Sequence, residues 1–384
     1  MNTLEKLRIL AESAKYDICA STASPRKVTG TQRIGNTAIA GICQSFTPDG
    51  RCVSLFKVLL SNHCQNDCAF CFTRSAHCRK KAEFEPKEMA NLFMNLYVRN
   101  YVEGLFLSSG IRGSPERIQE RIVETAELLR NNYQFQGYMH LKIMPGAPRD
   151  LLNETTRLAD RASVNLEASN KQYFSESVST MNYSSDILTR VSWLRSAKKA
   201  GHIKSGHTTQ FVVGYAEEPD KSLLTTSDRL YRYQDLKRAY FSAYGSEALS
   251  HQIIDKHKLR EHRLYQADWL MRVYKIPLKE LFFKEEGNLP LRVDPKFAMA
   301  LEDASGRFPA EINEAPYEDL IRVPGLGPKS AQRIIRLRES GEKINSAKTL
   351  RTLGVVTKRA LPFVSINDKR QTRIKEHILP FLKA

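Results

Sequence analysis

Residues 52–71 of the chain read CVSLFKVLLSNHCQNDCAFC. The first part, Cys52–Leu60, is an apolar run with the length of one β-strand, and its Val and Phe residues favour that conformation. Three cysteines follow directly, in the spacing Cys64-x3-Cys68-x2-Cys71. Parallel α/β folds place their functional sites at the carboxyl ends of their strands. This stretch therefore predicts a buried strand that carries a cysteine-rich site on the loop behind it.

Apolar runs of strand length recur along residues 51–250, and amphipathic segments of helical period separate them. The further runs are Gly104–Ser108, Tyr138–Ile143, Ser163–Leu166, Thr209–Val213 and Arg238–Ala243. One helical segment places Met89, Phe93 and Leu96 on a single face. Six strands that alternate with helices predict an α/β fold with a parallel sheet. Because six units are too few for an eight-stranded barrel, an open doubly wound sheet and an incomplete barrel both fit.

The three cysteines match the ligands of an iron–sulfur cluster. Thiolates bind such clusters, and three of them can hold three irons of a [4Fe–4S] cubane. The fourth iron is then open to a small molecule, which distinguishes a catalytic centre from an electron carrier. A zinc site completed by Cys78, His63 or His77 is an alternative, as are unrelated buried thiols. Zinc sites usually contain paired C-x2-C knuckles, and the sequence has no second pair.

Composition and charge indicate where the protein is located and what kind of partner it binds. With 41% hydrophobic residues and no run of 18 apolar residues, the chain is not expected to cross a membrane. The first 17 residues mix charges of both signs and lack the apolar core of a signal peptide, so we expect a cytoplasmic protein. The net charge is +17, and residues 322–384 hold 15 Lys and Arg against 4 Asp and Glu. This basic segment indicates a surface for polyanions, with a solvated disordered tail as the alternative.

The basic segment contains the stretch VPGLGPKSAQRII at Val323–Ile335. Gly325 and Gly327 allow a tight turn at the start of a helix, where backbone amides favour a phosphate. Three cations surround this point: Lys329, Arg333 and Arg336. The stretch resembles a helix-hairpin-helix DNA-binding motif over about residues 315–340. Such hairpins contact backbone phosphates, so the resemblance implies salt-dependent binding without base readout.

The role of the Gly-Leu-Gly turn and that of a possible second hairpin both stay open. The Gly-Leu-Gly turn could connect two packed helices without binding DNA. A second, degenerate hairpin at Leu350–Leu361 keeps one glycine, which leaves its phosphate binding open.

The motif C-x3-C-x-aromatic-C, in which Phe70 precedes Cys71, resembles the radical S-adenosylmethionine (SAM) superfamily over about residues 51–250. That resemblance implies a partial (β/α)6 TIM-like barrel with a [4Fe–4S] cluster on the three cysteines. SAM would bind the open iron, and its reductive cleavage would release a 5′-deoxyadenosyl radical that attacks the substrate. A reductant such as flavodoxin or ferredoxin would supply the electron.

The resemblance also implies which residues contact SAM. They are Phe70, Ser108, Ser109, Gly110, Asn165, Glu167, Val213 and Gly214. The Ser-Ser-Gly segment stands where the superfamily has a Gly-Gly-Glu-like segment whose backbone receives the methionine amine, and its acidic side chain is missing here. Polar residues after the fourth strand typically contact the ribose or carboxylate, and the fifth strand contacts the adenine.

Cys19, Cys43 and Cys52 form no compact ligand loop, and we favour the interpretation that they are buried small hydrophobic residues. An auxiliary cluster is one alternative. A thiol that donates a hydrogen atom to a substrate radical, as in spore photoproduct lyases, is another.

We divide the chain into an N-terminal extension or lid (1–50), a radical SAM partial barrel (51–250), a helical linker (251–305) and an all-α helix-hairpin-helix DNA-binding domain (306–384). The combination resembles a bacterial subfamily of radical SAM proteins assigned to DNA modification or repair, whose partners include a uracil-DNA glycosylase-like protein. Phrases such as Gly104–Gly110 carry this resemblance. It implies an enzyme that acts on DNA and that, where the target is double-stranded, extrudes the target base from the duplex. An RNA-modifying radical SAM enzyme, and a DNA-binding protein with a structural or redox-sensing cluster, are the alternatives.

Overall fold

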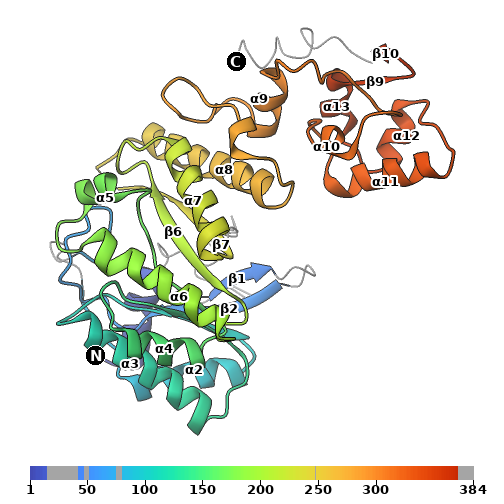
Figure 1. The fold of residues 1–384 in the computed structure, drawn as a ribbon. Helices are drawn as coiled ribbons and strands as arrows, with labels where there is room; N and C mark the ends of the chain where they lie inside the picture. Colours follow the sequence, from blue (N-terminus) through green and yellow to red (C-terminus); the bar gives the residue numbers. More distant parts are fainter. Residues whose placement is uncertain (15–41, 47–51, 75–79, 247, 371–384) are drawn as a thin grey trace, which may run out of the picture. The chain divides into compact units, whose positions relative to one another are not determined.

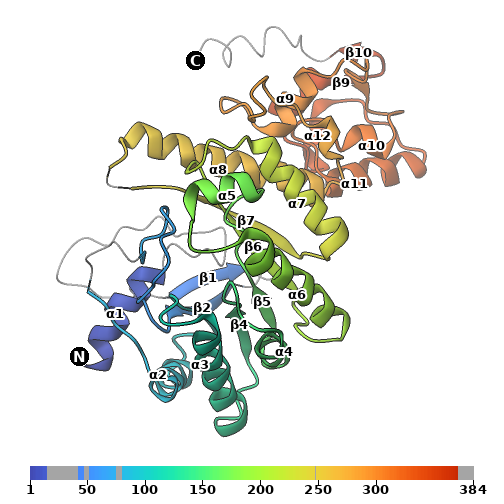
Figure 2. The same ribbon diagram turned by 60° about the vertical axis from the view of Figure 1, so that its left-hand side comes forward.

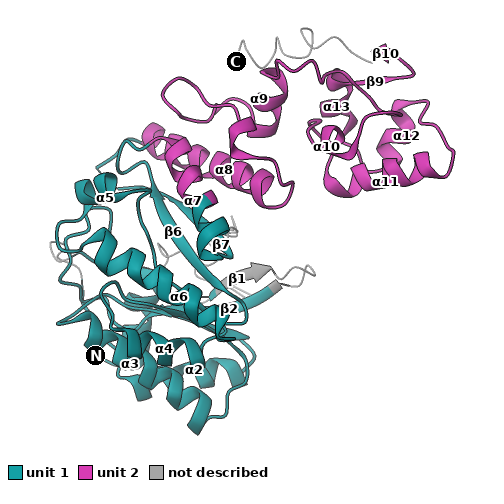
Figure 3. Ribbon diagram, in the orientation of Figure 1, with its two compact units in different colours: residues 1–218, 229–250 teal, residues 219–228, 251–384 magenta. Residues whose placement is uncertain are grey.

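A computed structural model of the chain describes residues 1–14, 42–46, 52–74, 80–246 and 248–370 (Figures 1 and 2). The chain forms two compact units, which Figure 3 distinguishes by colour. Unit 1 comprises residues 1–218 and 229–250, and unit 2 comprises residues 219–228 and 251–384. Helix α7 (Asp220–Gln234) contributes residues to both units.

Unit 1 is built on a seven-stranded sheet whose strands lie in chain order. They are β1 (Ile42–Phe46), β2 (Cys52–Leu59), β3 (Gly104–Ser108), β4 (Tyr138–Lys142), β5 (Arg161–Ser163), β6 (His207–Val213) and β7 (Arg238–Ala243). β1 pairs with β2 in antiparallel orientation, and β2 to β7 are parallel. A doubly wound sheet reverses its strand order, whereas sequential right-handed crossovers place all connecting helices on one face. The parallel strands therefore form a half-barrel, which confirms the predicted partial (β/α)6 fold.

Helices follow the strands of unit 1 along its outer face (Figures 1 and 2). They are α2 (Pro86–Val98), α3 (Pro115–Glu127), α4 (Arg149–Leu158) and α6 (Thr189–Lys199), with π-helical turns at Leu128–Asn132 and Tyr183–Leu188. The short helix α5 (Lys171–Ser177) lies apart from them, at the end of the sheet where the cysteine loop lies (Figure 2). Ser114 caps α3 by accepting a hydrogen bond from Arg117 N at 3.1 Å, as expected for a serine before a helix. The N-terminal helix α1 (Thr3–Ser13) is joined to α2 by an ion pair of 2.6 Å between Lys6 and Glu88.

Two strands differ from the sequence-based expectation. β1 lies within the predicted N-terminal extension and is defined by its pairing with β2, a tertiary contact that its own periodicity does not reveal. β5 ends at Ser163, although the apolar run continues to Leu166. Leu166 N donates to the side-chain hydroxyl of Thr209 at 3.0 Å instead of to a backbone carbonyl of β6, and the chain then turns at Glu167.

Unit 2 is mainly helical, as predicted for the C-terminal region. Its helices are α8 (His251–Arg272), α9 (Pro295–Leu301), α10 (Tyr317–Leu320), α11 (Pro328–Glu339), α12 (Ala347–Thr352) and α13 (Thr357–Ala360), with 3-10 turns at Leu278–Glu280 and Leu361–Phe363. It also holds a small sheet of β8 (Ala310–Glu311), β9 (Val364–Ile366) and β10 (Lys369–Arg370). Strands of two or three residues carry no readable periodicity, so the sequence did not predict them.

One apolar core joins the segments of unit 2. It includes Phe297, Leu320, Ile334 and Phe363, and Tyr274 packs against it. Residues of the predicted linker thus share a core with the predicted hairpin. None of the described helices is both long enough and apolar enough to cross a membrane.

Candidate cluster site and nucleic-acid interface

The three cysteines lie on the loop that follows β2, at the carboxyl end of the half-barrel. Cys68 is buried, whereas Cys64 and Cys71 are half-buried, and none of the three forms a disulfide. Burial raises the pKa of the Cys68 and Cys71 thiols, and the neighbouring cysteines add to this effect. Thiols in such a place can ionise when a metal compensates their charge, so they are a suitable donor set for a metal centre.

One side of the cysteine loop is tied to the segment that follows α5. Ala69 N donates to Ser177 O at 2.9 Å. The Asp67 carboxylate accepts hydrogen bonds from the Thr180 hydroxyl at 2.8 Å and from Ser179 N at 3.2 Å. Hydrogen bonds from Ser179 and Thr180 lower the pKa of Asp67 to about 2, so this carboxylate stays ionised at neutral pH. The loop is thus held by partners more than 100 residues away in sequence.

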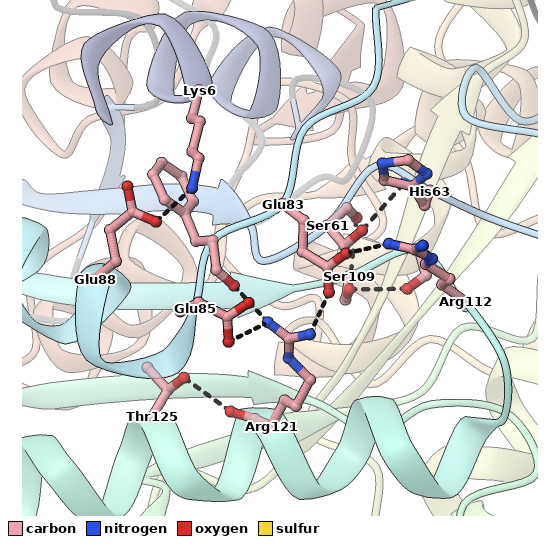
Figure 4. A network of polar contacts seen from close by, with 12 residues as sticks. Lys6, Ser61, His63, Glu83, Glu85, Glu88, Ser109, Arg112, Arg121 and Thr125 are labelled. Atoms are coloured by element: carbon pink, nitrogen blue, oxygen red, sulfur yellow. Dashed lines mark hydrogen bonds and ion pairs between the residues drawn. The ribbon is translucent and has the colours of Figure 1, made fainter. Parts of the chain in front are cut away.

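The other side of the loop rests on the end of β3. Gly110 N donates to Ser61 O at 2.7 Å, and Ile111 N donates to Cys64 Sγ at 3.5 Å. Figure 4 shows Ser61 beside His63 at this corner. A Cβ at Gly110 would lie 2.5 Å from the His63 carbonyl oxygen, so only glycine lets the strand end approach the first cysteine.

Ion pairs support the same corner (Figure 4). Glu83, which forms a β-bridge with Ser61, pairs with Arg112 at 3.0 Å and also with Arg121 of α3. Arg121 reaches Glu85 at 3.2 Å as well. The network connects α3 to the segment that follows the cysteine loop, and that segment bridges to Ser61 in front of the loop. We infer that it resists movement of the loop.

The donor set fits a [4Fe–4S] cluster. A cubane assigns each cysteine to a different iron, so its ligands need not converge on one point. Within the described residues, no three His, Cys, Asp or Glu side chains converge to hold a single metal ion. The alternative zinc ligands His77 and Cys78 lie outside the described residues, as do Cys19 and the side chains of Cys43 and Cys52.

Two of the predicted SAM contacts lie beside the cysteines. Lys142 Nζ donates to Asn165 Oδ1 at 2.7 Å, and Asn165 Nδ2 donates to Glu167 Oε1 at 3.0 Å. Besides burial and Cys71, the Glu167 carboxylate raises the pKa of the Cys68 thiol, so these groups face one site. Glu167 has a φ of 64°, which is uncommon for a residue other than glycine and is typical of functional positions.

The remaining predicted SAM contacts divide between the site and the core. Ser108 O accepts a hydrogen bond from Leu60 N at 2.8 Å, and Ser109 is half-buried beside it. Val213 is fully buried in β6, and Gly214 follows with a φ of 90° that lets the chain leave the strand. The contacts of these residues with SAM stay predictions.

Three residues at the strand ends were missed by the sequence analysis: Lys142, Tyr215 and Tyr244. Each lies at or within two residues of the end of its strand. Their position at the strand ends could have identified them from the sequence, because functional side chains of a parallel sheet meet at its carboxyl edge. The Tyr215 ring contacts both the Phe70 ring and the Tyr244 ring.

The predicted hairpin precedes α11. Gly325 has a φ of 80°, and Gly327 is the N-cap residue of α11. The three predicted DNA-binding cations of this helix are all exposed: Lys329, Arg333 and Arg336. The degenerate second hairpin packs on the first, because Val356 N donates to Gly325 O at 2.8 Å. Exposed cations near a helix N-terminus are a favourable arrangement for phosphate.

A buried lysine supports this hairpin from α9. Lys296 is 7% exposed, and its Nζ donates to Leu326 O, between the two glycines of the turn, at 2.5 Å. The same nitrogen lies 4.7 Å from the centre of the Tyr274 ring. The sequence analysis missed Lys296 because it lies in the predicted linker, far from the hairpin along the chain.

Comparison with known proteins matches two families. The radical SAM superfamily matches residues 58–230, and the helix-hairpin-helix motif matches residues 309–361. None of the curated proteins matches the chain significantly.

Several solved structures are similar at low identity. HydG, a maturase of the [FeFe]-hydrogenase, is 14% identical with a TM-score of 0.44, covering 56% of this chain and 48% of its own. HydG from Carboxydothermus hydrogenoformans is 14% identical with a TM-score of 0.43, covering 54% of this chain and 50% of its own. Methylornithine synthase (PylB) is 13% identical with a TM-score of 0.43, covering 77% of this chain and 84% of its own. The match therefore spans about half the length of the two maturases.

The two family matches, taken with the half-barrel and its cysteine loop, establish that the chain contains a radical SAM superfamily domain and, nearer its C-terminus, a helix-hairpin-helix motif.

Proposed function

We propose that the chain is a radical SAM enzyme that modifies or repairs DNA. The observation that carries the proposal is the presence in one chain of a three-cysteine loop at the carboxyl end of a half-barrel and of an exposed basic hairpin. A hairpin that binds phosphates supplies affinity for a polynucleotide, and the barrel supplies the chemistry.

The residues of unit 1 would act as follows. Cys64, Cys68 and Cys71 would each hold one iron of a [4Fe–4S] cluster. When bound, the cluster supplies the electron that cleaves SAM to methionine and a 5′-deoxyadenosyl radical, which abstracts a hydrogen atom from the substrate. Glu167, oriented by Asn165, would accept hydrogen bonds from SAM beside the cysteines.

The residues of unit 2 would hold the substrate. Lys329, Arg333 and Arg336 would neutralise backbone phosphates, which makes binding salt-dependent and independent of base sequence. A base inside a duplex must be extruded to reach the site, so base flipping belongs to the proposal. Flavodoxin or ferredoxin would serve as the reductant, and a uracil-DNA glycosylase-like protein as a partner.

The deciding experiment measures 5′-deoxyadenosine after the reconstituted, reduced protein is mixed with SAM, with and without duplex DNA. We expect the product to form and duplex DNA to increase its rate. Cys68→Ala should abolish both the visible absorbance of the cluster and the product. Gln65→Ala, an exposed position on the same loop, should retain both. An intact cluster without product under either condition would contradict the enzyme proposal, and stimulation by tRNA instead of DNA would contradict the substrate.

A further inference from the structure

An aromatic chain runs along the edge of the half-barrel beside the cysteines. The Phe70 and Tyr215 rings meet edge to face, with centroids 6.0 Å apart and an interplanar angle of 73°. The Tyr215 and Tyr244 rings meet at 5.0 Å and 84°. All three side chains are half-buried. By contrast, Phe211 of β6 and Phe241 of β7 are fully buried. Each ring therefore keeps part of its surface exposed.

The contact between Phe70 and Tyr215 follows from the curvature of the sheet. Phe70 lies on the loop after β2, whereas Tyr215 follows β6, and three strands separate β2 from β6. In a flat sheet the two rings could not touch, because neighbouring strands are about 4.8 Å apart. The curvature of the sheet brings the cysteine loop to the end of β6. Tyr244 N donates to Val213 O at 2.9 Å, and this hydrogen bond positions the backbone of Tyr244 next to the end of β6. The rings thus stand at the edge where the cysteines lie.

A polar row lies at the same carboxyl edge of the half-barrel. Lys142, Asn165 and Glu167 are connected by hydrogen bonds of 2.7 and 3.0 Å. Asn165 and Glu167 are the residues that we propose bind SAM, so a base stacked on the rings would lie beside SAM. A nucleobase is flat and carries donors and acceptors on its edge. Sites for extruded bases therefore combine aromatic stacking with hydrogen bonds to the base edge.

We propose that Tyr215 and Tyr244 form a stacking site for one nucleobase of the polynucleotide substrate, reached by a base that is single-stranded or extruded from a duplex. This inference rests on the proposed function and adds the part of the substrate that enters the site. Stacking on an aromatic side chain contributes about 1–3 kcal/mol per base, so loss of one ring should weaken single-strand binding about tenfold.

The probe is an oligonucleotide with one 2-aminopurine, tested as a single strand and as a duplex with full-length protein, before and after cluster reconstitution. We expect the wild type to quench 2-aminopurine emission in the single strand. Tyr215→Leu and Tyr244→Leu should lose the quenching and bind the single strand about tenfold more weakly, whereas their Phe variants keep the ring and should retain both. Tyr233→Leu is the matched control, because Tyr233 is 64% exposed on α7.

The outcomes separate this inference from the proposed function. Unchanged quenching in both Leu variants, or an equal loss in Tyr233→Leu, overturns the stacking site while the hairpin can still bind DNA. Failure of the wild type to bind any oligonucleotide overturns the proposed function as well. The cluster absorbance of each Leu variant shows that unit 1 is folded, so a loss of quenching in a variant with wild-type absorbance supports the stacking site.

Discussion

Replacing Lys296 by methionine tests whether the amine beneath the hairpin is buried as the structure places it. Burial lowers the pKa of Lys296 to about 7, the charge of Arg359 lowers it as well, and Asp294 opposes the shift. An exposed lysine has a pKa of 10.5, which is the value expected in the unfolded chain. Between these two pKa values the unfolded chain binds a proton that the folded chain does not.

The sign and size of the effect follow from this difference. Stability rises with pH wherever the unfolded state binds more protons than the folded state. The free energy of unfolding should therefore rise from about pH 7 towards pH 10.5, and Lys296 should add no pH dependence below this window, where both states bind the proton. One pKa unit corresponds to about 1.4 kcal/mol, so the rise between pH 7 and pH 9 is about 2–3 kcal/mol. Lys296→Met should lack it.

Urea unfolding at pH 7, 8 and 9 measures the rise. The chain has two tryptophans, and Trp193→Phe leaves Trp269 of α8 to report on unit 2. The difference between the wild-type and Lys296→Met curves removes the contributions of other titrating groups. Lys348→Met, at an exposed lysine of α12, is the matched control and should keep the rise. Parallel curves for the wild type and Lys296→Met would refute the reasoning.

Three further predictions concern glycines and cations. Gly110→Ala should weaken cluster loading about tenfold by iron analysis, because overpacking costs about 1–3 kcal/mol, while Ser109→Ala should load normally. Gly325→Ala places a Cβ 2.6 Å from a carbonyl oxygen of the second turn at a φ of 80°, so the midpoint of urea unfolding of unit 2 should fall. Removing Lys329 and Arg333 together should lower the salt dependence of log K for DNA by about two, and an unchanged slope would contradict phosphate contact.

Local sequence patterns predicted six strands that alternate with helices, because these elements are long enough to carry their periodicity. The patterns fitted a doubly wound sheet equally well, and only the resemblance of the cysteine motif implied the half-barrel. The cysteine spacing and the Gly-Leu-Gly turn are also local, and both stand where expected. The small sheet of β8 to β10 and the antiparallel strand β1 depend on pairing between distant segments. Nothing in the two residues of Lys369–Arg370 distinguishes a strand from a turn.

The supports of both sites could not be predicted for the same reason. Asp67 holds the cysteine loop through Ser179, 112 residues away, and Lys296 holds the hairpin through Leu326, 30 residues away. A lysine that is buried against a backbone carbonyl, or an aspartate that accepts hydrogen bonds from a distant loop, looks in sequence like any exposed lysine or aspartate. Only the fold shows which of the 59 Lys and Arg side chains are taken out of solvent.

The second hairpin illustrates how a degenerate motif can keep a role. Its turn retains Gly354 at a φ of 87°, and a Cβ there would lie 3.1 Å from the Arg333 guanidinium. Arg333 Nη1 also donates to Leu353 O at 3.3 Å, so one predicted phosphate contact rests on the second turn. Val356 N holds Gly325 O of the first turn in the same way. Because these contacts use only the backbone of the second turn, its sequence can lose the features of phosphate binding and still position the first hairpin.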